Sequence, residues 1–237
     1  MINVAVIGSS GAIGNAFLEA YIADPQVQKI YSFSKSKITI KDKRVVHINI
    51  DITDEKSIEN AALSIKGNLL DQIIIATGLL HNQSFGPEKS IKDIKKDNFT
   101  EIFSVNTIGP ALIGKFFIPL LNKKERSHMA FLSARVGSIS DNRLGGWYSY
   151  RASKSALNQI IKNFSIETKR TNSKAIIIGL QPGTVKSNLS QPFQKNVKEG
   201  NMFSPQDSVS ALMKVINKTT EGDSGNLIGW DGETINP

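Results

Sequence analysis

The pentapeptide "YRASK" places Tyr150 and Lys154 four positions apart in a run whose composition is typical of a helix. Side chains four apart share one face of an α-helix, so the phenol and the ammonium can meet at one site. A tyrosine exchanges protons near neutral pH only if its pKa falls well below about 10, and a neighbouring cation has that effect. Tyr148 lies round the helix from Lys154. The spacing therefore favours Tyr150 as an acid/base, and we expect Tyr148 to pack or to line a pocket.

A second candidate for chemistry is the turn "GSSGAIG", which spaces Gly8, Gly11 and Gly14 directly after an apolar run. Three missing side chains allow a tight turn, close approach of a pyrophosphate and close packing of helix on strand. The N-terminus of the following helix offers N–H groups to anions, and Ser9 and Ser10 add hydroxyl donors. An ordinary glycine-rich connection has the same composition. Its place in the first strand–helix–strand unit favours a dinucleotide.

Apolar runs alternate with helical segments along almost the whole chain. We expect strands over 2–8, 29–35, 44–51, 71–78, 128–134, 174–183 and 226–230. We expect helices over 12–23, 54–66, 91–104, 107–122, 148–171 and 205–218. Strands that are apolar on both faces need burial on both sides and hence a parallel arrangement. The pattern predicts a single α/β domain over 1–237, with a doubly wound, mostly parallel sheet and ligands beyond the carboxyl ends of its strands.

Composition restricts the function classes. The 237 residues, 40% of them hydrophobic, can bury a full core, and the net charge of +8 comes from scattered lysines without interleaved aromatics. Nucleic-acid binding is therefore not expected. The chain has no cysteine, which removes disulfides and thiolate chemistry, and no metal site is expected. The first apolar run lacks a basic leader and is too short to span a membrane, so we expect a cytoplasmic protein without a membrane partner.

Five further motifs follow in order: "NIDITD" (49–54), "IATG" (75–78), "SVNTIGP" (104–110), "LSARVGS" (132–138) and "QPGTVKS" (181–187). With the glycine turn and "YRASK", the chain resembles a short-chain dehydrogenase/reductase over essentially its whole length. The spacing in "GSSGAIG" is similar to that of the C-factor-like subgroup. The resemblance implies a seven-stranded Rossmann fold, a proton relay through Asn, Ser, Tyr and Lys, and hydride transfer between a nicotinamide and a carbonyl or alcohol carbon.

The resemblance also implies residue roles. Tyr150 is the acid/base, Lys154 lowers its pKa and binds the nicotinamide ribose, and Asn106 holds a helix kink and a relay water. Asp51 contacts adenine, and Val185 contacts the carboxamide. The cofactor-binding residues implied are Gly8, Ser9, Ser10, Gly11, Ile13, Gly14, Ser34, Lys35, Asp51, Ile52, Ala76, Thr77, Gly78, Tyr150, Lys154, Pro182, Gly183, Val185 and, near phosphate, Ser187.

Two positions depart from the family pattern. The family's "NNAG" is "IATG" here, so Ala76 replaces an asparagine and Thr77 is the candidate for a replacement hydrogen bond. The family's substrate-orienting serine falls on Ala134. Ser133, one residue earlier, reaches the site if a bulge re-aims it, and Ser138 is a second candidate. We favour Ser133 as the catalytic serine.

The end of the second strand decides cofactor preference. Proteins selective for NADH usually place an acid there, but "SFSKSK" has none between Tyr31 and Lys41. Ser34 takes the approximate place of the acid, and Lys35 follows as a cation for a 2′-phosphate. Ser36 and Lys37 can add donors. The alternative is that Lys35 and Lys37 are solvated loop lysines. The stretch favours NADP(H) over NAD(H).

Residues 184–204 form the expected substrate lid, with Phe193, Met202 and Phe203 as its apolar surface and Trp147 beside the acid/base helix. The resemblance implies a homodimer or homotetramer assembled through helices 107–122 and 148–171. The expected function is an oxidoreductase for a small carbonyl or alcohol substrate. The alternative is a dinucleotide-binding sensor or signalling protein on the same fold, against which the Tyr150–Lys154 pair argues.

Overall fold

The computed structural model describes residues 1–196 and 202–237, and its centre is an eight-stranded sheet. The strand order is β10-β9-β6-β5-β4-β1-β2-β3, and every neighbouring pair is parallel except β9–β10. The strands are β1 (Ile2–Ile7), β2 (Val27–Ser34), β3 (Val45–Asn49), β4 (Gln72–Ile75), β5 (Ser127–Leu132), β6 (Ala175–Gln181), β9 (Leu227–Gly229) and β10 (Thr234–Ile235). The predicted mostly parallel, doubly wound sheet is confirmed. The two-residue strand β10 adds an eighth, because so short a strand has no sequence pattern of its own.

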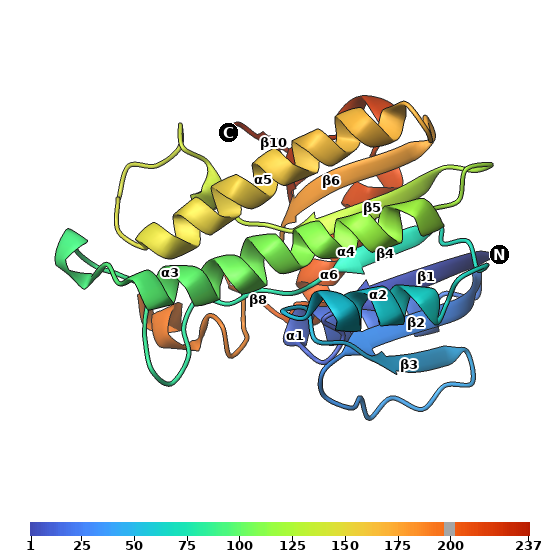
Figure 1. Ribbon diagram of the computed structural model, residues 1–237, viewed down its shortest axis with the longest axis horizontal. Coiled ribbons are helices and arrows are strands. Elements are labelled where there is room, and N and C mark those ends of the chain that lie inside the picture. Colours follow the sequence, from blue (N-terminus) through green and yellow to red (C-terminus); the bar gives the residue numbers. More distant parts are fainter. Residues whose placement is uncertain (197–201) are drawn as a thin grey trace.

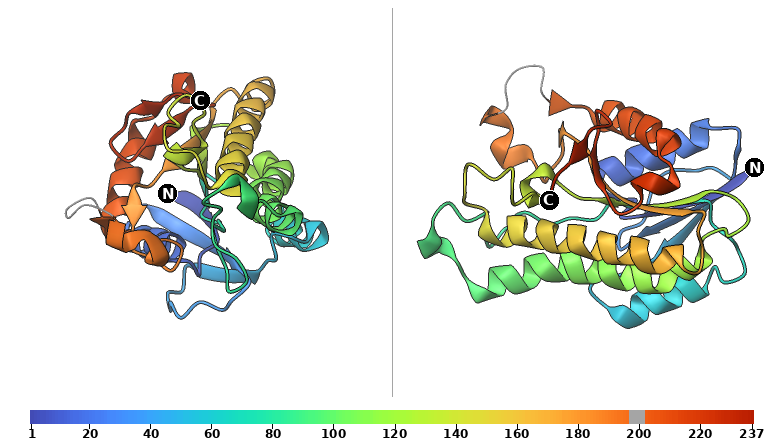
Figure 2. Two further views of the ribbon diagram at one scale, coloured as in Figure 1. Left: turned by 90° about the vertical axis from the view of Figure 1, so that its left-hand side faces the viewer. Right: turned by 90° about the horizontal axis from the view of Figure 1, so that it is seen from above.

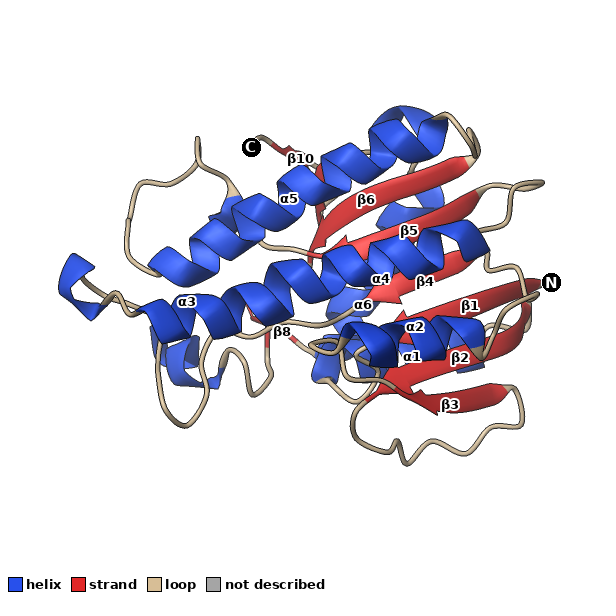
Figure 3. Ribbon diagram, viewed as in Figure 1, coloured by secondary structure: helices blue, strands red, loops and turns tan. Residues whose placement is uncertain are grey.

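Helices cover both faces of the sheet (Figures 1 and 2). One face carries α2 (Glu55–Leu63), α3 (Lys96–Phe103), α4 (Gly109–Phe117) and α5 (Tyr148–Lys169). The other face carries α1 (Ala12–Ala23) and α6 (Pro205–Lys218). Figure 3 distinguishes the helices, in blue, from the strands of the sheet, in red.

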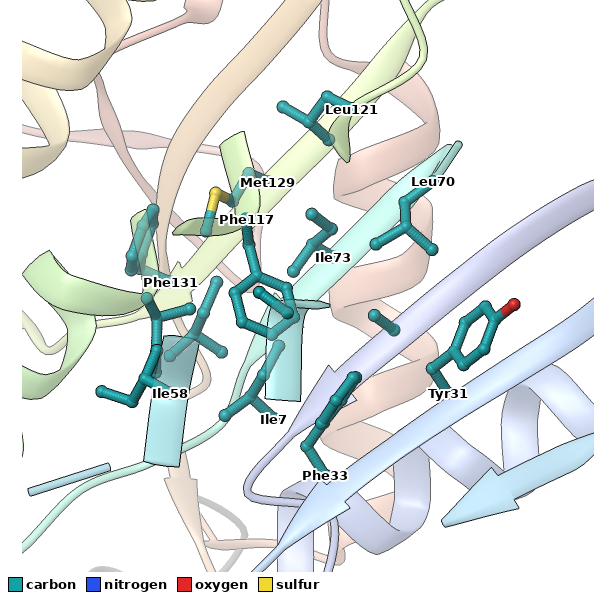
Figure 4. Packing of buried hydrophobic residues seen from close by; sticks show 14 of the residues in the cluster. Ile7, Tyr31, Phe33, Ile58, Leu70, Ile73, Phe117, Leu121, Met129 and Phe131 are labelled. Carbon is teal, nitrogen blue, oxygen red and sulfur yellow. The ribbon is translucent and has the colours of Figure 1, made fainter. Parts of the chain in front are cut away.

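The core has two layers because the strands are apolar on both faces. Along β4, Ile73 and Ile75 face α2, α4 and α5, whereas Ile74 faces α1 and α6. Phe117 of α4 and Phe131 of β5 pack in the first layer (Figure 4). A sheet buried on both sides is the condition under which parallel strands are stable.

The helices predicted over 91–104 and 107–122 form one helical segment, Lys96–Leu120, with a π-helical turn at Ser104–Ile108. It begins later than predicted because Ser90 caps a separate 3₁₀ turn, Ile91–Asp93. By length and composition alone this segment could cross a membrane, and 44% of its most apolar window is buried in the structure. The apolar composition of a core helix that packs on a sheet has the same appearance.

The predicted lid, 184–204, contains regular structure in its described part. Its strand β7 (Thr184–Val185) pairs in parallel with β8 (Met202–Phe203), and a 3₁₀ segment covers Gln191–Asn196. Residues 197–201 of this expected lid lie outside the described residues. The two ends of the expected lid are therefore paired with each other in a small second sheet.

Candidate active site

The first turn of α5 carries Tyr150, and an unusual backbone leads into it. Gly145, Gly146 and Trp147 are all left-handed, with φ of 64°, 63° and 51°. A left-handed tryptophan is strained by about 1–2 kcal/mol, so tertiary contacts must hold it. Its N–H donates to the carbonyl of Glu88 at 2.6 Å, and the buried Glu88 carboxylate accepts from the N–H of Ser149. A carboxylate at a helix N-terminus is favoured by the helix dipole, so Glu88 stabilises the start of α5.

Two cavities meet at Tyr150. One cavity, of ≈ 630 Å³, lies beside the glycine turn and has Gly11, Thr77 and Lys154 on its wall. The other, of ≈ 620 Å³, lies under Trp147. Tyr150 borders both cavities. A phenol in this position can touch a cofactor on one side and a substrate on the other.

We call the ≈ 630 Å³ cavity the glycine-turn cavity and the ≈ 620 Å³ cavity the Trp147 cavity.

Burial controls the protonation of the Tyr150–Lys154 pair. It raises the pKa of Tyr150 to about 12 and lowers the pKa of Lys154 to about 8. Lys154 Nζ donates to the carbonyl of Leu132 at 2.9 Å and lies 5.8 Å from the centre of the Tyr150 ring. Burial is the cause of the raised pKa of Tyr150, and the expected lowering of this pKa by Lys154 stays a prediction. The phenol is protonated at neutral pH, which is the form that donates a proton.

Asn106 lies fully buried in the π-helical turn, where the sequence predicted a kink. Its Oδ1 accepts from the N–H of Leu79 at 2.7 Å, and its Nδ2 donates to the carbonyl of Leu79 at 2.8 Å. Nδ2 also donates to Ser153 Oγ at 3.1 Å. Asn106 thus joins the segment after β4 to α5, and its part in a water relay stays a prediction.

The structure brings Ser133, not Ser138, to the site. Ser133 borders both cavities, but its Oγ donates to Asn158 Oδ1 at 2.6 Å. A hydroxyl has one proton, so toward the cavities Ser133 can only accept while this bond lasts. Ser138 is buried and accepts from the N–H of Asp141 in a local turn. Ala134 lies on the wall of the Trp147 cavity and has no hydroxyl to offer.

Some polar groups of the glycine turn bond to β2, whereas others are exposed. The N–H groups of Gly8 and Ser9 and the hydroxyl of Ser9 all donate to the carbonyl of Phe33, and Ser9 is fully buried. Ser9 therefore holds the turn against β2 and does not offer the predicted hydroxyl to a ligand. Ser10 and Gly11 are exposed, and no side chain caps α1 at Gly11. The uncapped N–H groups of α1 are free to bind an anion.

The glycine-turn cavity fits a nicotinamide dinucleotide. Thr77 Oγ1 is buried on its wall without a hydrogen-bond partner, so the expected replacement bond is not made within the chain. A Cβ on Gly78 would approach only to 3.8 Å of its nearest neighbours, which include Lys154 Nζ at 3.9 Å. Ala76 and Ile13 also line this cavity. A free hydroxyl, a lysine and an uncapped helix N-terminus suit a phosphorylated, hydroxyl-rich ligand.

At the end of β2, Lys35 and Asp51 form an ion pair. Lys35 Nζ lies 2.7 Å from Asp51 Oδ2, with 77% of the Lys35 side chain exposed. The Lys35 hydrogen bond, followed by those of Thr53, lowers the pKa of Asp51 to about 2. Ser34 is buried and donates to the carbonyl of Ser36 at 2.7 Å. The ion pair thus joins Lys35, predicted to bind the 2′-phosphate, to Asp51, predicted to contact adenine. Ile52 directly follows Asp51 in the sequence.

The turn after β6 borders both cavities through Pro182 and Ser187. Gly183 has φ of 75°, and the carbonyl of Val185 accepts from Ser190 Oγ at 2.5 Å. Of the residues predicted for the lid, only some line the Trp147 cavity.

Phe193 lines the Trp147 cavity and packs on Trp147 with ring centres 5.0 Å apart. Phe203 packs instead on Trp230 at 4.6 Å, and Met202 pairs with Thr184 in the small sheet. Phe193 and Trp147 thus form the aromatic part of this cavity wall, and its role as a substrate lid stays a prediction.

Sequence reasoning missed several residues on these walls. Asn158 follows Lys154 by one helical turn, so the periodicity of α5 could have identified it. The arginines of the Trp147 cavity gave no such signal, because the tertiary fold brings them together. They are Arg135, Arg143 and Arg151. Within residues 1–196 and 202–237, no group of three or more His, Asp or Glu could hold a metal ion.

A doubly wound parallel sheet with an open glycine turn and a Tyr–Lys pair at the strand ends defines a dinucleotide-binding oxidoreductase. Residues 3–198 match the family model for short chain dehydrogenase, and the chain belongs to that family. It is therefore a dehydrogenase/reductase that uses a nicotinamide cofactor.

Individual relatives agree with this family. The chain is 31% identical over 189 residues to 1-hydroxy-2-glutathionyl-2-methyl-3-butene dehydrogenase of Rhodococcus sp. strain AD45, covering 79% of this chain and 78% of the relative. It is 25% identical to the C-signal protein of Myxococcus xanthus, covering 62% and 82% of the two chains. The crystal structure of NADPH-bound carbonyl reductase from chicken fatty liver matches with a TM-score of 0.86 and 23% identity, covering 100% and 99%.

Proposed function

We propose that the protein is an NADPH-preferring reductase of small carbonyl compounds in which Tyr150 donates the proton. The position of Tyr150 on the shared wall of the two cavities carries the proposal. When bound, the cofactor supplies a hydride. The names of the chicken carbonyl reductase and the Rhodococcus dehydrogenase support a small carbonyl or alcohol substrate.

The chain's own residues handle the proton. Burial keeps the pKa of Tyr150 at about 12, so the phenol carries its proton at neutral pH and donates it to the substrate oxygen. Lys154, with a pKa of about 8, is mostly an ammonium at neutral pH and stabilises the phenolate that this transfer leaves. Lys154 also faces the glycine-turn cavity, where it can donate to ribose hydroxyls.

The test is Tyr150→Phe, which removes the proton donor and keeps the ring that packs on Trp147. We expect carbonyl reduction to fall by about 10²- to 10⁴-fold, with NADPH affinity nearly unchanged. Steady-state NADPH oxidation with a panel of ketones, aldehydes and quinones gives the rate, and fluorescence titration gives the affinity. Full turnover by the variant would exclude Tyr150 as the donor.

Cofactor preference is proposed to depend on Lys35. Its ion pair with Asp51 is exposed, and such pairs are weak, so a 2′-phosphate can compete for the ammonium. We expect NADPH to bind about tenfold more tightly than NADH, and Lys35→Ala to remove most of that difference. Lys41→Ala, farther along the same loop and also exposed, is the matched control. Equal affinity of the wild type for both cofactors would refute the assignment.

A second candidate function is a dinucleotide-binding sensor. It is favoured by Ala134, which lacks the hydroxyl of the family pattern, and by Ser133, whose hydroxyl donates to Asn158 Oδ1. A sensor would bind NADPH and oxidise it with no member of the carbonyl panel. The same panel therefore separates the two functions.

A further inference from the structure

The Trp147 cavity is lined by more cations than its own carboxylate can neutralise. Arg135, Arg143 and Arg151 lie on its wall, and the acid there is Asp141. Asp141 pairs with Arg135 at 3.4 Å. In the described part of the chain, neither Arg143 nor Arg151 has a carboxylate within ion-pair distance.

Arg151 is the most buried of the three arginines at this wall. It follows Tyr150 directly on α5 and is half-buried. Its Nη1 donates to the carbonyl of Val136 at a long 3.3 Å, and its Nε is buried without a partner. A buried N–H that makes no hydrogen bond costs free energy, so the chain itself leaves this guanidinium incompletely satisfied. Guanidinium groups bind carboxylates with two parallel hydrogen bonds, which suits this role.

The rest of the wall is apolar. Trp147 and Phe193 present aromatic rings, and Leu80 adds an aliphatic surface. Leu144 also lines the cavity although 90% of it is exposed, so an apolar side chain lies open at this site. The wall combines an apolar surface with unpaired positive charge.

We propose that the substrate is a carbonyl compound with a carboxylate on an apolar body, and that Arg151 binds the carboxylate. Arg143 adds positive charge to the same wall. The inference rests on the proposed function, because the carbonyl is placed at Tyr150. The arginines on the wall of the Trp147 cavity are the evidence that the substrate carries a carboxylate.

The first experiment compares terephthalaldehydic acid with its methyl ester as substrates for NADPH-dependent reduction. We expect the wild type to favour the acid by about tenfold in kcat/KM, mainly through KM. Arg151→Gln should bring the ratio of acid to ester close to one, and Arg151→Lys should restore part of it. Arg170→Gln, at the exposed far end of the same helix, removes the same charge and should keep the wild-type ratio.

The second experiment measures binding without turnover. Calorimetric titration should show that Arg151→Gln loses about tenfold in affinity for benzoate and little for benzamide. Equal losses for both ligands would overturn the inference, because they would show that Arg151 acts only by supporting Val136.

The two proposals fail in different ways. A wild type that reduces the ester at least as well as the acid overturns the anion site and leaves the reductase intact. A wild type that reduces neither compound, nor any member of the carbonyl panel, contradicts the proposed function, while selective benzoate binding would still support Arg151.

Discussion

Ala134 leaves the substrate side of the site with fewer hydroxyl donors than the family pattern supplies. Ser133 Oγ donates its proton to Asn158 Oδ1, so it can only accept from a ligand while this bond lasts, and its catalytic role stays a prediction. Under the proposed mechanism, Tyr150 is then the donor closest to the reacting oxygen, and the shape and charge of the Trp147 cavity must orient the substrate. Orientation by a remote group is a recognised use of binding energy.

His128 gives a pH prediction at the residue scale. It is buried on β5, and burial, followed by the charge of Arg126, lowers its pKa to about 4. Above pH 6.5 the ring is neutral in both the folded and the unfolded protein. As pH falls from about 6.5 to about 4, the unfolded chain takes up the proton first, so stability falls. Between pH 7.5 and 4.5 the loss should be about 2 kcal/mol.

Urea unfolding of the wild type and of His128→Leu at these two pH values measures this term. The variant places an apolar side chain at this buried position, and the titrating carboxylates other than Glu221, whose charge acts on His128, contribute equally to both proteins. The fall in unfolding free energy should be smaller in the variant. The same fall in both proteins would show that His128 titrates normally.

At the scale of elements, the approach of α1 to β1 decides the shape of the glycine turn. A Cβ on Gly14 would collide with the carbonyl oxygen of Gly8, which is backbone and cannot move aside. Gly14→Ala should therefore lower the unfolding free energy by about 1–3 kcal/mol, although alanine favours helices. It should also weaken NADPH binding, because α1 shifts relative to the turn.

Thermal unfolding and fluorescence titration check both effects. Gly86→Ala is the control, since a Cβ there meets nothing within 4 Å. A Gly14→Ala protein as stable as this control, with wild-type affinity for NADPH, would contradict the role of close packing at the turn.

At the scale of the whole molecule, α4 and α5 lie side by side on the outside of the sheet (Figure 1). Ile108, which directly precedes α4, is 53% exposed, and Ile166 of α5 is 50% exposed. Exposed apolar side chains on neighbouring helices are typical of an assembly surface. We expect a homodimer or homotetramer that uses this face, as the family resemblance implies.

Light scattering at micromolar concentration should give a mass of two or four times 25.9 kDa. Ile166→Asp should shift the distribution toward monomer, whereas Leu63→Asp, an equally exposed position on α2, should not. A monomeric wild type would exclude the assembly.

The sequence by itself determined the features that depend on local periodicity. Apolar runs on both strand faces gave the parallel sheet, the spacing of Gly8, Gly11 and Gly14 gave the turn, and helical periodicity placed Tyr150 with Lys154. These patterns are local, because strand alternation, helical pitch and the absence of Cβ atoms act within a few residues.

Only the tertiary structure decided what surrounds these residues. It placed Ser133 against Asn158, joined Lys35 to Asp51, and gathered the arginines around the Trp147 cavity. It also raised the pKa of Tyr150, where the sequence favoured a lower value. Burial, and contacts between segments far apart in the chain, determine which hydroxyl is free and which charge is paired, and no local pattern specifies them.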